Sequence, residues 1–316
     1  LRYYQLKLSN FINKNFKNEN KENVASYAQS ILENKINDLV LNTLKVQNSE
    51  NICLSGGVFA NVKLNQTIYE KTRKNIFIMP GMDDGGLSIG AALHVYELKS
   101  GLQAKENFDN IYFGPKYTDE EILSELKKFN FKFEKTENIE QKIASHLHEG
   151  SIIGRFNGSM EWGPRALGNR SILAAPVDKK INKVLNDRLN RTEFMPFAPI
   201  ILKEKFNEYF NNYDTELKCI KFMTITLNVK KEKIKSIPAV VHIDNTARPQ
   251  LVTKEINNSL HNILKEYEKF SKIPVLVNTS FNLHEEPIVC SPYDALRAFE
   301  QGAVDYLALE NFWISK

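Results

Sequence analysis

Residues 157–171 combine three glycines, a proline and a tryptophan with two arginines, Arg165 and Arg170, which stand five positions apart. The stretch shows no hydrophobic periodicity, so packing alone does not explain its residues. A guanidinium group held on a rigid backbone binds phosphate through paired hydrogen bonds. The stretch therefore predicts an anion site, and pairing of either arginine with a carboxylate such as Glu161 is the structural alternative.

Two later segments are also polar and follow apolar strands. They run from Asp244 to Gln250, with Arg248 inside, and from Asn278 to Asn282, with Ser280 inside. Because ligands bind at the carboxyl ends of strands in α/β sheets, we expect both segments to project at a common sheet edge.

Near the N-terminus, Ser55-Gly56-Gly57 separates a short apolar strand from a helix that begins near Val58. Glycines in this position let backbone N–H groups approach a phosphate, and the helix N-terminus adds a favourable dipole. A tight turn that needs only glycine's backbone freedom explains the pair equally well. The GxxxxGK[ST] and GxGxxG nucleotide motifs are absent from the sequence.

A second glycine loop, Asp83-Asp84-Gly85-Gly86, follows the next apolar strand. An Asp at this edge can hold a metal ion or a ribose hydroxyl. One carboxylate cannot complete a metal site, and the alternative is that the Asp only caps the following helix.

The elements that position these loops alternate between strand and helix, which indicates an α/β fold. In the first part we predict helices over 21–46, 58–70 and around 89–96, and strands over 52–54 and 76–79. In the second part we predict strands over 152–156, 223–229, 237–243 and 275–277, and helices over 260–270 and around 295–299. The charged run 230–235 is expected to be a solvated hairpin or strand edge.

The composition is that of an ordinary globular protein: 316 residues, 42% apolar side chains, and 42 Lys+Arg against 38 Asp+Glu. The net charge of +4 is too small to indicate a dedicated nucleic-acid binder, so nucleic acid is not expected as a partner. No apolar run approaches the roughly 20 residues that cross a bilayer, so no membrane association is expected. Three scattered cysteines without a CxxC pair favour a reducing, cytoplasmic location, and the six histidines show no metal-ligand spacing.

Taken together, several of these segments resemble the ATP-dependent O-carbamoyltransferases of nodulation-factor and antibiotic biosynthesis. The resemblance extends from about Val24 to the C-terminus. Its segments are LSGGVFAN (54–61), PGMDDGGLSIGAA (80–92), GSMEWGPRALGNRSIL (158–173), MPFAP (195–199), TARPQ (246–250) and VNTSFN (277–282).

The resemblance implies the second lobe of an actin-like (ASKHA) domain followed by a YrdC-like α/β domain. We accordingly place the carboxyl-terminal lobe of the actin-like domain at 1–100, a connector at 101–140 and the YrdC-like domain at 141–316. Because the chain begins at Leu1 and family members carry another actin-like lobe before this region, we expect a fragment. That missing N-terminal lobe would be a covalent or non-covalent partner.

The resemblance also implies the reaction. The second domain would form carbamoyladenylate from ATP, with Mg²⁺, and carbamoyl phosphate, and the first would transfer the carbamoyl group to a hydroxyl of a small-molecule acceptor. A divalent metal, for which Fe²⁺ is a candidate, would sit in the actin-like domain.

The residues implied for these roles fall into three sets. ATP and carbamoyl phosphate would be bound by Arg165, Arg170, Arg248, Asn278 and Ser280. The adenylate would be bound by Ser55, Gly56, Gly57 and Asn61, and Asp84 would be a metal ligand. The catalytic base is unknown and would lie in the missing lobe.

The sequence departs from the family pattern at Leu189 and Met195, where a Lys and an Arg are expected, and Arg188 and Arg191 are the candidate substitutes. Carbamoyl phosphate is therefore a less secure donor than ATP. The alternatives are a threonylcarbamoyl-type tRNA modification enzyme and a non-catalytic nucleotide-binding module.

Overall fold

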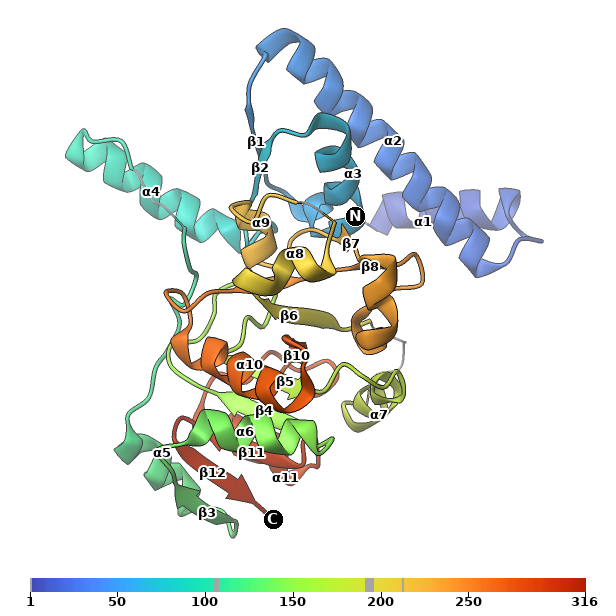
Figure 1. Ribbon diagram of the computed structural model, residues 1–316. Coiled ribbons are helices and arrows are strands. Elements are labelled where there is room, and N and C mark those ends of the chain that lie inside the picture. The colour runs from blue at the N-terminus through green and yellow to red at the C-terminus, as the bar shows by residue number, and fades with distance from the viewer. Residues whose placement is uncertain (1, 105–107, 191–195, 212) are drawn as a thin grey trace.

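The computed structural model describes residues 2–104, 108–190, 196–211 and 213–316. Figure 1 shows an N-terminal part of long helices around a small sheet, above a larger C-terminal part built on a broad sheet. Together they make the mixed α/β fold that the alternating pattern predicts. Among the described residues, no helix is long and apolar enough to cross a membrane.

The N-terminal part is built from seven elements. They are α1 (Arg2–Asn15), α2 (Lys21–Gln47), β1 (Asn51–Leu54), the 3-10 helix η1 (Gly57–Ala60), α3 (Val62–Thr72), β2 (Asn75–Ile78) and α4 (Gly86–Ser100). Strand β1 pairs in parallel with β2, and α3 makes the crossover between them. The predicted helices over 21–46 and 89–96 and both predicted strands are confirmed.

The core of this part lies between the small sheet and α3. Ile52 and Leu54 of β1 and Ile76 of β2 are buried with Leu64 and Ile68 of α3. The helix predicted from Val58 begins later, because Asn61 accepts a hydrogen bond from the Leu64 N–H and caps α3.

The C-terminal part contains an eight-stranded mixed sheet with the order β3-β12-β11-β4-β5-β10-β6-β9. Its strands are β3 (Lys132–Lys135), β4 (Ile153–Phe156), β5 (Arg170–Ala174), β6 (Ala198–Leu202), β9 (Gln250–Val252), β10 (Val275–Ser280), β11 (Tyr306–Leu309) and β12 (Phe312–Ser315). The β4–β11 and β6–β9 pairs are parallel, and the other five pairs are antiparallel.

Helices cover both faces of this sheet. The helices of this part are α5 (Asp119–Leu126), α6 (Ile139–His148), α7 (Lys180–Arg188), α8 (Phe206–Tyr209), α9 (Lys218–Lys221), α10 (Asn258–Ser271) and α11 (Pro292–Glu300), with 3-10 helices η2 (Lys203–Lys205), η3 (Lys231–Ser236) and η4 (Pro238–Val240). Helices α6 and α10 lie side by side on one face, and α11 packs on the other (Figure 1).

Two predicted strands are wrong. Over 223–229 only Leu227–Asn228 forms a strand, β7, which pairs with β8 (Thr246–Ala247). Met223 has φ 54°, which an extended strand cannot contain. Over 237–243, Pro238 opens the 3-10 helix η4. The charged run 230–235 largely forms η3 rather than a hairpin or strand edge.

The segment 101–140, predicted as a connector, includes regular structure. Strand β3 pairs with β12 at the edge of the large sheet, and α5 carries a complete capping box at Thr118. Residues 119–135 therefore add a helix and an edge strand to the C-terminal part.

Candidate functional site

A cavity of about 80 Å³ opens where the polar segments predicted from the sequence come together. It lies at the end of β10, next to the loop that precedes β5 and the segment that precedes β9. Its lining residues are Pro164, Arg165, Ala166, Pro196, Phe197, Met223, Arg248, Asn278, Thr279 and Ser280. The two segments expected at a common sheet edge, 244–250 and 278–282, both contribute to this cavity, and the arginine stretch joins them there.

Arg165 and Arg248 give the cavity its charge. The Nε atom of each is buried and has no hydrogen-bond partner, and no ion pair among the described residues involves either side chain. Burial lowers the pKa of Arg165. Burial, and then the charge of Arg165, lower the pKa of Arg248 to about 9, which leaves Arg248 charged at neutral pH.

Two like charges without a counterion are unfavourable in a low-dielectric site. No carboxylate is present among the lining residues in the described parts of the chain. An anion with several oxygens would relieve the repulsion between Arg165 and Arg248 and supply the missing hydrogen-bond acceptors. The arrangement is therefore suited to a phosphate-containing ligand.

Asn278 and Ser280 lie on β10 at the wall of the cavity. The Asn278 amide donates to the Ala166 carbonyl and to Oε1 of Gln250, both at 3.1 Å. Its Oδ1 is buried and has no partner. Gln250, which sequence reasoning did not single out, thus ties β9, β10 and the arginine loop together.

Arg170 is placed differently from Arg165. It is fully buried, does not line the cavity, and donates to the carbonyls of Asn157, Gly158 and Pro115 at 3.0–3.2 Å. Its guanidinium also lies 3.5 Å from the centre of the Phe156 ring. These contacts give Arg170 a structural role, and we leave it out of the ligand-binding set.

Glu161 does not form the ion pair that was the alternative for the arginines. Its Oε1 accepts hydrogen bonds from the main-chain N–H groups of Leu167, Asn169 and Arg170. Burial raises the pKa of this carboxyl, and the main-chain donors partly oppose that rise. The carboxylate organises the loop instead of neutralising Arg165.

The glycine loops of the N-terminal part form a separate, exposed group. Ser55, Gly56 and Gly57 are exposed, and the Gly56 N–H donates to the Met82 carbonyl at 2.7 Å, so the two loops meet. The Asn61 amide donates to Gln29 of α2 at 2.7 Å while its Oδ1 caps α3. This group does not line the cavity.

Asp84 is exposed on the second of these loops. Within the described residues, no three His, Cys, Asp or Glu side chains gather closely enough to hold a metal ion. The neighbouring Asp83 Oδ1 already accepts a hydrogen bond from the Gly85 N–H. The residues present do not fit a complete metal site.

Two contacts join the N-terminal part to the cavity region. A Cβ built on Gly81 would lie 2.5 Å from the Trp162 ring, so the loop after β2 packs closely on the arginine loop. The buried Asn65 amide donates to the Thr224 carbonyl at 2.7 Å, next to the cavity residue Met223.

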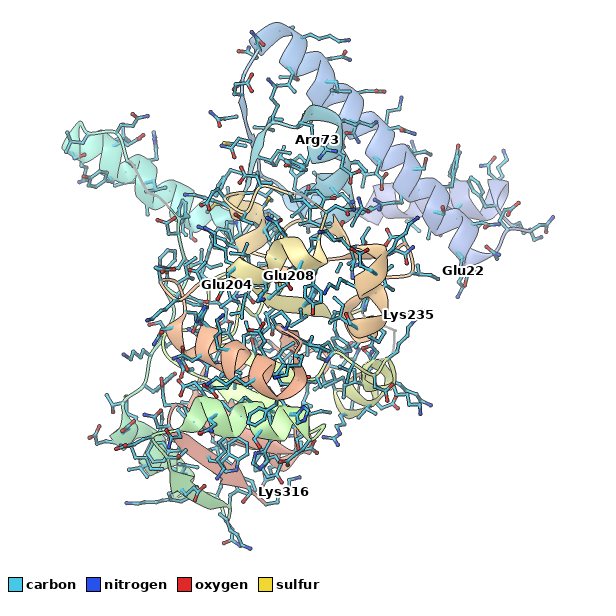
Figure 2. All side chains as sticks on the ribbon, viewed as in Figure 1. Glu22, Arg73, Glu204, Glu208, Lys235 and Lys316 are labelled. Atoms are coloured by element: carbon cyan, nitrogen blue, oxygen red, sulfur yellow. The ribbon has the colours of Figure 1, made fainter. Side chains whose placement is uncertain are left out.

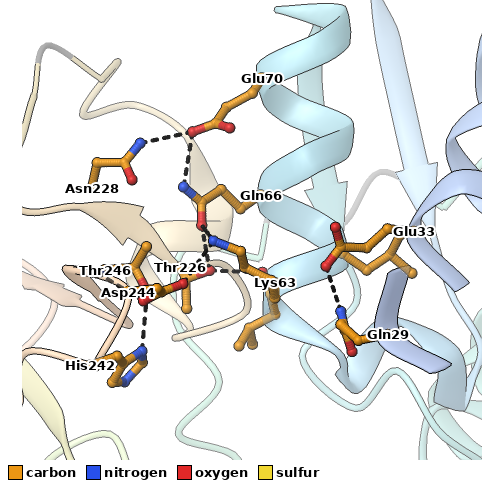
Figure 3. A network of polar contacts seen from close by, with 12 residues as sticks. Gln29, Glu33, Lys63, Gln66, Glu70, Thr226, Asn228, His242, Asp244 and Thr246 are labelled. Atoms are coloured by element: carbon orange, nitrogen blue, oxygen red, sulfur yellow. Dashed lines mark hydrogen bonds and ion pairs between the residues drawn. The ribbon is translucent and has the colours of Figure 1, made fainter. Parts of the chain in front are cut away.

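Helix α3 makes a row of polar contacts with the C-terminal part (Figure 3). Lys63 pairs with Asp244 at 2.8 Å, and Gln66 accepts from the Thr226 hydroxyl at 2.8 Å. Glu70 accepts from the Asn228 amide at 2.9 Å. Burial tends to raise the pKa of Asp244, but hydrogen bonds from Lys63 and Thr246 outweigh it and bring the pKa to about 2.

The positions that depart from the family pattern are only partly described. Leu189 is fully buried in the core, and Arg188 forms an ion pair with Asp305 at 2.7 Å. Met195 and Arg191 lie outside the described residues. Arg188 is not among the residues that line the cavity.

Comparison with known proteins places this chain in a family. Residues 144–316 match the model of the carbamoyltransferase C-terminus, and residues 5–93 match the model of the carbamoyltransferase N-terminus. The first match alone covers more than half of the chain. The chain belongs to the carbamoyltransferase family, as its motifs imply.

Similar proteins include the uncharacterised protein MJ1051 of Methanocaldococcus jannaschii, 38% identical over 94% of this chain and 57% of its own length. The nodulation protein NolO of Bradyrhizobium diazoefficiens is 33% identical over 93% of this chain and 54% of its own length. The chain therefore spans about half the length of these relatives.

Among solved structures, full-length HypF in its phosphate- and nucleotide-bound form matches 59% of this chain and 22% of its own, with 17% identity and a TM-score of 0.39. A doubly substituted variant of P. abyssi Sua5 matches 54% of this chain and 48% of its own, with 14% identity and a TM-score of 0.37.

Proposed function

We propose that the cavity binds the phosphate groups of ATP and carbamoyl phosphate and that carbamoyladenylate forms there. The observation that carries the proposal is the pair of buried guanidinium groups, Arg165 and Arg248, whose Nε atoms lack partners at one cavity. Membership of the carbamoyltransferase family supports the choice of carbamoyl phosphate over other anions.

The proposed first step joins two anions. Carbamoyl phosphate would take up water and release inorganic phosphate, and an oxygen of the resulting carbamate would attack the α-phosphorus of ATP. The bond to the β-phosphate breaks, and pyrophosphate leaves with the electron pair. Arg165 and Arg248 would reduce the repulsion between the reactants and stabilise the charge that develops on the phosphoryl oxygens.

The other lining groups would orient the ligands. Ser280 can donate a hydroxyl hydrogen bond to a phosphate oxygen, and the unpartnered Oδ1 of Asn278 can accept one from a carbamoyl amide. Mg²⁺ would enter bound to ATP, where it would neutralise further phosphate charge.

In the second proposed step, the carbamoyl group passes to a hydroxyl of a small-molecule acceptor. We propose that residues 1–100 act as the second lobe of an actin-like domain and that Ser55, Gly56, Gly57 and Asn61 bind the adenylate. Asp84 would supply one ligand to a divalent metal, with Fe²⁺ as a candidate. Because the described residues do not complete that metal site, we assign no step to it.

The remaining metal ligands and the catalytic base would come from a further lobe. The length of the relatives and the exposed surface of α4 support this partner: Leu87 and Leu98 are 72% and 71% exposed. The three cysteines are free, which agrees with the proposed cytoplasmic location.

Pyrophosphate exchange tests the adenylation step. Labelled pyrophosphate should enter ATP only when carbamoyl phosphate is present, and Arg165→Ala or Arg248→Ala should slow exchange by about tenfold or more, as expected for a lost charged hydrogen bond. Arg73→Ala is the matched control, because Figure 2 places this exposed arginine at the end of α3, in the N-terminal part.

The outcomes separate the alternatives. A folded chain without exchange, whose ATP binding is unaffected by both cavity substitutions, would instead be a non-catalytic module. Salt-sensitive binding of tRNA would favour the tRNA-modification alternative. Carbamoyl transfer to an acceptor by this chain alone would contradict the need for a further lobe.

A further inference from the structure

We propose that Glu161 is the positioning residue for Arg165, because it folds the loop that presents this arginine to the cavity. The inference rests on the proposed anion site. Glu161 does not line the cavity and forms no ion pair with Arg165. It would therefore act through its hydrogen bonds to the main chain of the loop.

The donors of the loop converge on one carboxylate oxygen. Oε1 of Glu161 accepts from the Leu167 N–H at 2.5 Å and from the Asn169 and Arg170 N–H groups at 3.2 Å each. The remaining N–H of this stretch, that of Gly168, donates to the Ser171 hydroxyl at 2.9 Å. Every main-chain N–H from 167 to 170 is therefore bound by a side chain.

The main-chain carbonyls of residues 166–168 also accept hydrogen bonds from side chains. Ala166 accepts from Asn278 at 3.1 Å, Leu167 from Gln250 at 2.8 Å and from Tyr112 at 2.9 Å, and Gly168 from Arg155 at 2.8 Å. Because the loop has no strand or helix to fix it, these side chains determine its path. Arg165 immediately precedes the clamped stretch.

Positioning matters here because nothing in the described chain holds the Nε of Arg165. The charge of Arg165 is near enough to lower the pKa of Arg248, and this repulsion disfavours the observed approach of the two groups. A loosened loop would let Arg165 move away from Arg248 into water. The anion site would then lose one of its two charges.

Two conservative substitutions separate positioning from charge. Glu161→Gln removes the charge but keeps an acceptor oxygen at the same reach, whereas Glu161→Asp keeps the charge but withdraws the acceptor by one methylene. If Glu161 positions the loop, Glu161→Asp should weaken binding of inorganic phosphate to the full chain by about tenfold, comparable with Arg165→Ala. Glu161→Gln should weaken it by no more than about twofold.

The coupling between residues gives a second readout. In the Glu161→Asp background, Arg165→Ala should have little further effect on the phosphate dissociation constant, whereas Arg248→Ala should keep its full effect. Glu310→Asp is the matched control, since its carboxylate accepts the Gly158 N–H at 2.6 Å but holds none of the residues 166–170. Near-ultraviolet circular dichroism would verify folding of each variant.

Each outcome has one meaning. The positioning role would be overturned if Glu161→Gln weakened phosphate binding more than Glu161→Asp does. Additive effects of Glu161→Asp and Arg165→Ala on phosphate binding would overturn it as well. If Arg165→Ala itself leaves phosphate binding unchanged, the proposed anion site fails, and the inference about Glu161 fails with it. The two failures are therefore distinguishable in one titration series.

Discussion

In the glycine-rich stretch 157–171, side chains that look alike in sequence have different roles. Arg165 faces the cavity, whereas Arg170 is buried and binds main-chain carbonyls. Both arginines satisfy the sequence criterion for phosphate recognition. The difference arises from tertiary contacts, since Phe156 of the neighbouring strand lies under the Arg170 guanidinium.

The conformation of Gly168 is a testable requirement of the same loop. It has φ 108°, and a Cβ added there would lie 2.4 Å from Cδ2 of Leu260 on α10. Gly168→Ala should lower the free energy of unfolding by about 2–4 kcal/mol, from backbone strain together with overpacking. Urea denaturation measures this change.

Gly150→Ala is the matched control for that measurement. Gly150 also has a positive φ, 94°, but a Cβ there meets no atom within 4 Å. Gly150→Ala should therefore lower the free energy of unfolding only by the cost of backbone strain, about 1–2 kcal/mol. Equal losses at both positions would contradict the close approach of α10 to the arginine loop.

Among the helices and strands, secondary structure is predicted best from the sequence where one face of the element is buried and the other is exposed. Helix α10 has its buried side chains at helical spacing, and its predicted range matches Asn258–Ser271 closely. The segment 223–229 misled because its apolar residues alternate with buried polar ones. Thr224 and Thr226 are buried against α3, so alternation there reflects a contact with another element instead of a half-exposed strand.

The sequence likewise predicts some residues of the candidate site and misses others. Motif resemblance identified Arg165, Arg248, Asn278 and Ser280, which the structure brings to one cavity. It could not separate the residues that line the cavity from Arg170, nor assign a role to Gln250 at the end of the TARPQ segment. Those distinctions depend on tertiary hydrogen bonds, such as Arg170 to Pro115 and Gln250 to Leu167, which no local pattern encodes.

Helix α3 joins the two parts of the molecule, and Asn65 is its most buried polar contact. The Asn65 amide donates to the carbonyls of Phe59 and Thr224 at 2.8 and 2.7 Å and is fully buried. Asn65→Ala should lower the free energy of unfolding by about 2–4 kcal/mol, because it removes the donor to the buried Thr224 carbonyl and the partly buried Phe59 carbonyl and opens a small cavity.

The exposed Asn23 of α2 provides the comparison for Asn65. Its amide donates only to Glu19 at 3.2 Å on the surface, so Asn23→Ala should change the free energy of unfolding by less than about 0.5 kcal/mol. If Asn65→Ala were as mild as Asn23→Ala, the contact between α3 and the C-terminal part would contribute little to the fold.

For the whole molecule, the two parts differ in how fully they are packed. The eight-stranded sheet has helices on both faces, whereas the two-stranded sheet buries one face against α3 and leaves Asn51, Cys53 and Asn75 exposed on the other. Helix α4 extends away from the body in Figure 1 and has no buried residue. Among the described helices of eight residues or more beyond α1, α4 thus stands out as one that buries none of its side chains.

Helix α4 gives the last prediction, which tests whether this surface is used. A helix of 15 residues that buries no side chain is marginally stable in water, because tertiary packing supplies most helix stability in proteins. The amides of α4 should therefore exchange with deuterium much faster than those of α3, whose Leu64 and Ile68 are fully buried. Exchange followed by mass spectrometry on dilute protein measures both helices in one sample.

A matched pair of substitutions extends the test. Leu98→Ser on α4 should leave the unfolding free energy of this chain within about 0.5 kcal/mol, whereas Leu64→Ala on α3 should lower it by about 2–5 kcal/mol. Protection of α4 equal to that of α3 in dilute protein would mean that this chain already packs the helix, and it would contradict the proposal that a further lobe covers it. Fast exchange that slows when such a lobe is added would identify α4 as the surface on which the proposed further lobe docks.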